Sequence, residues 1–265
     1  LHVKGLINIQ FVIHHNKVYI IEANPRASRT VPYMSKVTGL PIVEIATRAM
    51  LGERIIDMGY TPGLYHEAAC KAVKAPVFSF EKVQDANSLL GPEMKSTGEV
   101  LGVGRTLKEA LYKALAAAGF RFVTENGEPR RGVLLSVESR QLGEIAPLVR
   151  SLDGSGKLMF ATPETADAIK ALGCYAFDIG SVSHTADLGG FLERAGIGLV
   201  IYVGALHDDT MGDYVELHRQ AVKRGIFCIT SLDTALAAAG LLGERLSPDS
   251  TELLDIGGVG DFRGL

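Results

Sequence analysis

The order of apolar and polar positions gives the start of the chain the pattern of a hairpin followed by a helix. Apolar, β-branched runs at Gly5–Ile13 and Val18–Ala23 flank the polar residues 15–17. This pattern predicts two antiparallel strands joined by a tight turn. Helical spacing over Ile42–Leu51 stops at Gly52 and predicts a helix with glycine just beyond its end.

The next stretch mixes a strand pattern with residues that favour loops. Lys71–Phe80 is predicted to be an extended strand. Asp85–Gly104 is rich in Gly, Pro, Asn and Ser, and is predicted to be mostly loop. Gly102-Val103-Gly104 lacks the full glycine pattern of a nucleotide-binding loop, so it is interpreted as a tight turn.

A helix start is marked clearly at Thr106. Thr106 and Glu109 have the spacing of a capping box, which predicts a helix that runs to about Ala118. The polar, charged segment Thr124–Arg131 is predicted to be a domain boundary.

Beyond Gly132, short apolar runs alternate with helical patterns. The predicted strands are Val133–Val137, Leu158–Ala161, Cys174–Phe177, Leu199–Val203 and Phe227–Ile229. The predicted helices are Arg140–Leu152, Pro163–Leu172, Leu188–Ala195, Tyr214–Arg224 and Leu232–Ala239. Continuous apolar strands separated by helices predict a parallel sheet covered on both faces.

Composition narrows the class of protein. The 265 residues are 47% hydrophobic and 22% charged, which is typical of a globular protein, and the net charge of −3 gives no reason to expect nucleic acid or a membrane as partner. Cys70, Cys174 and Cys228 are odd in number and far apart, so free thiols in the reducing cytoplasm are expected. The start at Leu1, without Met, predicts a piece of a longer chain.

The candidate metal-binding and phosphate-binding residues lie on and just after the predicted hairpin. Gln10 lies within one strand, and Glu22 and Asn24 lie two positions apart on the other, so all three can share one face. Their oxygens suit Mg²⁺ or Mn²⁺, and Arg26 and Arg29 follow with guanidinium groups that match phosphate geometry. A metal ion together with arginine side chains is typical of sites that catalyse phosphoryl transfer. The alternative is an ion pair of Glu22 with Arg26, with Gln10 in solvent.

Three stretches carry a family resemblance: Gly5–Phe11 (GLINIQF), Val18–Gly39 (VYIIEANPRASRTVPYMSKVTG) and Leu89–Thr106 (LLGPEMKSTGEVLGVGRT). They resemble the end of an ATP-grasp domain, and the connector after it, in the large subunit of carbamoyl-phosphate synthetase. The E-x-N-P-R core is shared with other ATP-grasp enzymes. The extension ASRTVPYMSKVTGLP is particular to this family.

The resemblance implies roles for the hairpin residues. Gln10, Glu22 and Asn24 match metal positions, Gln10, Glu22 and Arg26 match positions at the nucleotide, and Arg26 and Arg29 match catalytic residues near the phosphates. The implied reaction is that of the second ATP-grasp half, which phosphorylates carbamate with ATP. The implied partners are the rest of the large subunit, a glutamine amidotransferase small subunit, and bicarbonate and ammonia as sources of carbamate, in arginine or pyrimidine synthesis.

The expected fold class is α/β: a C-terminal remnant of an ATP-grasp domain (α+β), followed by a doubly wound parallel-sheet domain similar to methylglyoxal synthase. The expected bounds are 1–75 for the ATP-grasp remnant, 76–130 for the connector and 131–265 for the regulatory domain. The resemblance implies that the adenine-binding hinge and the phosphate-covering loop are missing. The chain alone is therefore expected to be inactive.

The last domain offers an effector site by the same resemblance. Thr162 and Thr165 match positions that contact the phosphate of a nucleotide, and Thr230 ends the last strand. From the residues alone, Thr162 as a plain helix cap is an equal alternative.

Several positions depart from the family pattern. Ser181 stands where lysine is expected, Tyr202-Val203-Gly204 replaces a hydroxyl-rich run, His207 replaces a basic residue, and Ala72 replaces an acidic one. These departures argue against regulation by nucleotides or ornithine.

Two rival functions remain. One is a binding or assembly module without catalysis. The other is a lyase of methylglyoxal-synthase type, which would leave the first segment unexplained.

Overall fold

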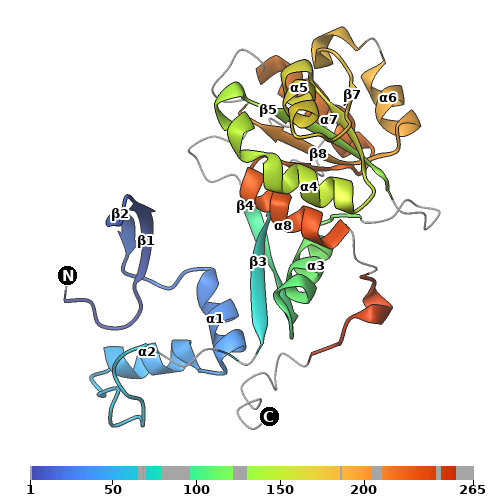
Figure 1. Ribbon diagram of the computed structural model, residues 1–265. Coiled ribbons are helices and arrows are strands. Elements are labelled where there is room, and N and C mark those ends of the chain that lie inside the picture. The colour runs from blue at the N-terminus through green and yellow to red at the C-terminus, as the bar shows by residue number, and fades with distance from the viewer. Residues whose placement is uncertain are drawn as a thin grey trace. The chain divides into compact units, whose positions relative to one another are not determined.

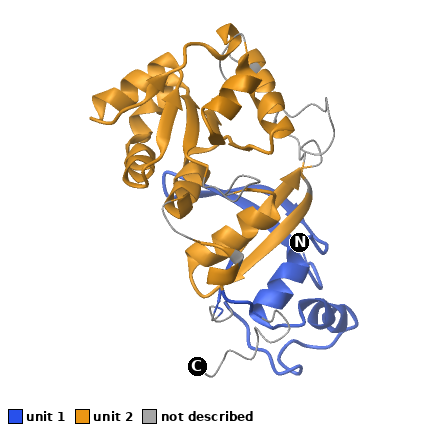
Figure 2. Ribbon diagram, turned by 90° about the vertical axis from the view of Figure 1, so that its right-hand side faces the viewer, with its two compact units in different colours: residues 1–72, 252–265 blue, residues 73–251 orange. Residues whose placement is uncertain are grey.

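The chain forms two compact units (Figure 2). The computed structural model describes residues 2–64, 68, 70–78, 96–121, 130–185, 187–204, 211–242 and 246–254. Unit 1 comprises residues 1–72 and 252–265, and unit 2 comprises residues 73–251.

Unit 1 contains the predicted hairpin and two helices (Figure 1). Strands β1 (Asn8–His14) and β2 (Lys17–Asn24) are antiparallel, and His14 pairs with Lys17 across a two-residue turn. Both turn residues, His15 and Asn16, have positive φ. That conformation is the one that a two-residue turn needs to match the twist of its strands.

Two helices follow the hairpin. Helix α1 (Thr30–Thr38) was not predicted, because Pro32 suggested a break. Pro32 lies in the first helical turn, where its missing N–H costs no intrahelical hydrogen bond. Helix α2 (Ile42–Met50) agrees with the prediction.

Unit 2 begins with a two-stranded sheet and a helix. Strand β3 (Lys71–Phe78) pairs with β4 (Ser96–Gly104), and α3 (Leu107–Ala117) packs on β4. The prediction of loop for 85–104 is therefore wrong over 96–104, including the turn expected at Gly102-Val103-Gly104. Residues 85–95 lie outside the described residues. Gly102 is needed for close packing, since a Cβ there would lie 2.0 Å from the carbonyl oxygen of Ala110 in α3.

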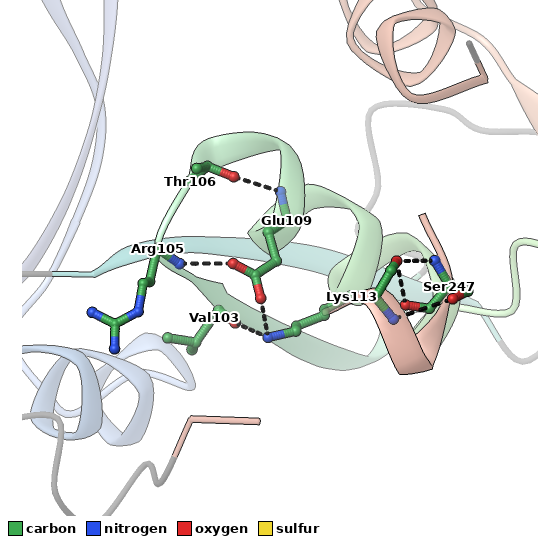
Figure 3. Close-up of polar contacts among 7 residues, drawn as sticks. Val103, Arg105, Thr106, Glu109, Lys113 and Ser247 are labelled. Carbon is green, nitrogen blue, oxygen red and sulfur yellow. Dashed lines mark hydrogen bonds and ion pairs between the residues drawn. The ribbon is translucent and has the colours of Figure 1, made fainter. Parts of the chain in front are cut away.

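The capping box at the start of α3 is confirmed (Figure 3). Thr106 Oγ1 accepts the N–H of Glu109 at 3.2 Å, and the Glu109 carboxylate accepts the N–H of Arg105 at 3.0 Å. Lys113 Nζ donates to Glu109 and to the carbonyl oxygen of Val103 in β4, at 2.9 and 3.0 Å. These contacts fix the start of the helix to the end of the strand.

The rest of unit 2 is a five-stranded parallel sheet in the order β7-β6-β5-β8-β9. The strands are β5 (Gly132–Val137), β6 (Leu158–Ala161), β7 (Phe177–Asp178), β8 (Ile197–Val203) and β9 (Phe227–Ile229). The helices are α4 (Ala146–Gly154), α5 (Pro163–Ala171), α6 (Leu188–Arg194), α7 (Met211–Lys223) and α8 (Leu232–Leu242). Short 3-10 helices cover Ser139–Glu144, Val182–His184 and Pro248–Ser250.

Two elements of the structure differ from their predicted bounds. The strand predicted at Cys174–Phe177 forms only at Phe177–Asp178, at the edge of the sheet. The helix predicted at Arg140–Leu152 is split into a 3-10 helix and α4. Pro147 lies in the first turn of α4, where it favours a new helix start.

Apolar side chains of the sheet alternate between two buried clusters. Leu135 and Ile201 pack with α3, α4, α5 and α8, whereas Leu134 and Val200 pack with α6 and α7. The sheet is thus covered on both faces, as predicted (Figure 1). Because Tyr112 and Leu115 of α3 share the first cluster, α3 belongs to the same compact unit as the sheet. The predicted bounds 1–75, 76–130 and 131–265 stay predictions.

Candidate functional site

The hairpin brings the three predicted oxygen donors to one face. Gln10 in β1 is the direct partner of Glu22 in β2, and Asn8 is the partner of Asn24. Residues directly opposite in an antiparallel pair point to the same side, with Cβ atoms about 4.5–5.5 Å apart. A spacing of two along β2 keeps Asn24 on that side.

The side chains on this face are available to a ligand. Asn24 Nδ2 donates to Glu22 Oε1 at 2.9 Å, so the amide and the carboxylate meet. Gln10 and Glu22 are exposed, and Asn24 is half-buried. The donor set consists of one carboxylate and two amides, which fits a hard divalent cation that keeps further positions for water and phosphate oxygens.

The two arginines lie on the segment between β2 and α1. The N–H of Arg26 donates to the carbonyl oxygen of Asn24 at 2.8 Å, and its side chain donates to the carbonyl oxygen of Ala27 at 3.0 Å. Arg29 precedes α1 and is exposed. Among the described residues, Glu22 forms no ion pair with Arg26, so the alternative of a strand-end ion pair is not what the structure contains.

A hydrogen bond links this segment to the hairpin. Asn8 Nδ2 donates to Ser28 Oγ at 3.4 Å, and the carbonyl oxygen of Ser28 accepts the N–H of Val31 at the start of α1. The carbonyl and hydroxyl of Ser28 therefore connect the donor face to the helix that follows the arginines.

The predicted effector hydroxyls lie at the carboxyl end of β6. Thr162 Oγ1 lies 3.2 Å from Ser136 Oγ and 3.3 Å from Thr165 Oγ1. Thr165 is fully buried, and its hydroxyl contacts the N–H and the carbonyl oxygen of Val137 in β5. Thr162 occupies the N-cap position of α5, as the alternative held, but its hydroxyl accepts no hydrogen bond from a helical N–H.

The structure separates Thr230 from this pair. Thr230 is exposed after β9, and the neighbouring Ser231 provides the hydroxyl that accepts the N–H of Thr234 in α8, at 3.4 Å.

The positions that depart from the family pattern have varied surroundings. Ser181 donates to Asp213 in α7 at 3.2 Å. Tyr202 is buried, and Ala72 is exposed in β3. His207 lies outside the described residues.

Sequence reasoning missed Glu138, the most buried carboxylate of the sheet domain. It follows β5, keeps 9% of its surface exposed, forms an ion pair with Arg140 Nε at 2.7 Å and accepts a hydrogen bond from Gln141 Nε2 at 2.6 Å. Its position directly after a buried strand was the only available signal.

Within the described residues, no group of three or more His, Cys, Asp or Glu side chains could hold a metal ion, and the hairpin set contains a single carboxylate. None of the helices in that part of the chain has the length and apolarity needed to cross a bilayer. The three cysteines are free thiols, of which only Cys70 is buried.

The first segment of the chain matches a known protein family. Residues 1–57 match the family described as carbamoyl-phosphate synthase L chain, ATP binding domain. Curated homologues of this chain are carbamoyl phosphate synthase large chains.

Three of these large chains illustrate the similarity. The protein of Clostridium botulinum (strain Loch Maree / Type A3) is 39% identical over 255 residues, and that of Clostridium perfringens (strain SM101 / Type A) is 41% identical over the same length. The protein of Lachnoclostridium phytofermentans is 42% identical over 257 residues. The alignments cover 96–97% of this chain but only 24% of each relative. The chain thus spans about a quarter of the length of these large chains.

Proposed function

We propose that this chain is the C-terminal portion of a carbamoyl phosphate synthase large chain, and that its hairpin supplies the metal-binding part of the site that phosphorylates carbamate. One observation carries the proposal: Gln10 and Glu22 are direct cross-strand partners, with Asn24 bonded to Glu22 on the same face. The names of the homologues and the match of residues 1–57 to an ATP-binding domain support the proposed reaction.

In the proposed reaction a carbamate oxygen attacks the γ-phosphorus of ATP. A new P–O bond forms as the bond to the β–γ bridging oxygen breaks, so the products are carbamoyl phosphate and ADP. Gln10, Glu22 and Asn24 would hold Mg²⁺ or Mn²⁺, which neutralises phosphate charge when bound. Arg26 and Arg29 would orient the phosphate oxygens through their guanidinium groups.

The hairpin also supports the proposal that further polypeptide is needed. Apolar side chains are exposed on both faces of β1 and β2: Phe11 and Ile20 are partners on one face, and Val12 and Tyr19 are partners on the other. A two-stranded hairpin is marginally stable alone, and continuous apolar strands are typical of sheets covered on both sides. An open face cannot exclude water from a phosphoryl transfer. The chain alone is therefore proposed to be inactive.

The proposed partners are the rest of the large chain and a glutamine-hydrolysing small subunit that supplies ammonia. An alternative function is a binding or assembly module without catalysis, which the same exposed apolar hairpin favours.

The experiment compares the chain alone with a chimaera in which it replaces the matching region of the Lachnoclostridium phytofermentans large chain. ATP formation from carbamoyl phosphate and ADP, the reverse of the proposed step, is measured with Mg²⁺. We expect activity in the chimaera and none in the chain alone. Activity of the chain alone would refute the need for further polypeptide. A folded chimaera without activity would favour the module.

A further inference from the structure

The segment that carries the two arginines is hydrogen-bonded to both strands of the hairpin. At its start, the N–H of Arg26 donates to the carbonyl oxygen of Asn24 in β2, at 2.8 Å. Further along, Ser28 Oγ accepts from Asn8 Nδ2 in β1, at 3.4 Å. Asn8 and Asn24 are direct partners across the hairpin. The segment thus leaves one member of a strand pair and returns to the other.

The return to β1 depends on the Ser28 hydroxyl. Between residues 25–29 and β1, both of which the structure describes in full, it makes the only hydrogen bond. Asn8 and Ser28 are half-buried, whereas Arg26 and Arg29 are exposed. Partial burial limits competition from water and strengthens a hydrogen bond, so this link is better protected than the arginines themselves.

The position of Arg29 follows from that of Ser28. The carbonyl oxygen of Ser28 accepts the N–H of Val31, in the first turn of α1, at 3.1 Å. Arg29 is the N-cap residue of α1, and its own side chain makes no capping hydrogen bond. Arg29 therefore lies between Ser28 and the helix that the Ser28 carbonyl helps to start.

The guanidinium group of Arg26 depends on the same residue. Arg26 Nη1 donates to the carbonyl oxygen of Ala27, at 3.0 Å. That carbonyl belongs to the peptide group that joins Ala27 to Ser28, so a shift of Ser28 moves the acceptor of Arg26. The places of both arginines relative to the oxygen donors of the hairpin are therefore tied to one serine.

We propose that Ser28 is a positioning residue, whose hydroxyl, bonded to Asn8, sets where Arg26 and Arg29 lie relative to the donor face of the hairpin. The inference rests on the proposed function, in which the two arginines orient the phosphate oxygens. Groups that orient a reacting species are precise only when their own supports are fixed. A misplacement of about 1 Å can lower a rate by up to about 100-fold.

The test uses the chimaera with the Lachnoclostridium phytofermentans large chain and measures ATP formation from carbamoyl phosphate and ADP. Ser28→Ala should lower kcat about tenfold, because the arginine segment loses its link to β1. Ser28→Thr keeps the hydroxyl and should restore most of kcat. The affinity for Mn²⁺, measured by electron paramagnetic resonance, should be the same in Ser28→Ala as in the unmodified chimaera, because no oxygen donor of the hairpin is changed.

The matched control is Ser35→Ala in α1. The Ser35 hydroxyl is buried and has no hydrogen-bond partner among the described residues, so its loss should leave kcat unchanged. The link itself is tested by a double-mutant cycle. If Asn8 and Ser28 act as one unit, Asn8→Ala/Ser28→Ala should lose no more than the weaker of the two single variants. Thermal unfolding shows whether each variant is folded.

Full kcat in folded Ser28→Ala would overturn the inference. So would losses that multiply in the double variant, an equal loss in Ser35→Ala, or a fall in Mn²⁺ affinity that accompanies the fall in kcat. If Ser28→Ala does not fold, Ser28→Cys replaces it, because a thiol of similar size is a weak acceptor. A folded chimaera that is inactive without any substitution contradicts the proposed function itself, whereas the other outcomes contradict only the role of Ser28.

Discussion

The hairpin of unit 1 and strand β8 of unit 2 are both rich in apolar β-branched residues but have opposite environments. Strand β8 (IGLVIYV) is buried along its whole length, whereas β1 and β2 (NIQFVIH and KVYIIEAN) are exposed at nearly every position. Ile201 in β8 has no exposed surface, and Ile20 in β2 keeps 64% exposed. A continuous apolar run is typical of a strand that is covered on both faces, and among the described residues β8 is covered in this way whereas β1 and β2 are not.

The largest expected effect comes from truncating the same residue type in both places. Ile201→Ala should lower the free energy of unfolding by about 2–5 kcal/mol, because it leaves a cavity between packed layers. Ile20→Ala should change it by less than about 0.5 kcal/mol. Urea unfolding followed by circular dichroism measures both. Equal losses would mean that the hairpin is packed in solution.

A glycine in β4 tests how closely unit 2 is packed. Gly102→Ala should cost about 1–3 kcal/mol of unfolding free energy, since its Cβ would overlap backbone atoms of α3. The matched control is Gly98→Ala in the same strand, where the nearest atom would lie 3.9 Å away. Thermal unfolding of the two variants should differ clearly, and similar melting temperatures would contradict the described contact of α3 with β4.

The stability of unit 2 should depend on pH because it contains a buried histidine. His218 in α7 is 6% exposed, and burial lowers its pKa below the ordinary value. The unfolded chain then binds this proton more readily than the folded one. The free energy of unfolding therefore keeps its full value above the pKa of histidine in the unfolded chain, about 6.5. It falls as the pH drops below that pKa, by up to about 1.4 kcal/mol per pH unit.

Replacement of His218 by Gln should flatten this part of the profile, measured as urea midpoints at several pH values. The control His184→Gln, at an exposed position, should keep the slope. An unchanged slope in the His218 variant would assign the pH dependence to other groups.

The smallest effect concerns the helix cap in unit 2. Thr106→Ala should cost about 1 kcal/mol, because the N–H of Glu109 loses its acceptor. Thr106→Ser keeps the hydroxyl and should restore most of that loss in the same urea assay. If Ser is no better than Ala, the hydroxyl is not the source of stability.

The sequence predicted features that depend on local pattern. The capping box, the hairpin turn and the alternation of parallel strands with helices follow from spacing that neighbouring residues determine, whereas the register shift in the hairpin does not. Strand β4 was missed because glycine and serine suggest loop, whereas Gly102 is required by the closeness of α3. The position of Glu138 depends on Gly204, 66 residues away, and no local pattern reveals such a contact.

In the candidate site, too, local sequence pattern predicted some features and not others. A period of two predicted that Glu22 and Asn24 share a face, but Gln10 lies opposite Glu22 because the register shifts between Gln10 and Phe11. The hydrogen bond of Asn8 to Ser28 was not predictable, because it depends on how the segment after β2 turns back toward β1.

The most direct test of the central claim uses the chimaera with Glu22→Gln. The account predicts at least about 100-fold less ATP formation from carbamoyl phosphate and ADP than in the unmodified chimaera, with unchanged thermal unfolding, because the only carboxylate of the donor set is lost. Glu44→Gln, an exposed glutamate in α2, should retain full activity. Full activity in the Glu22 variant would contradict the claim that this hairpin binds the metal of the reaction.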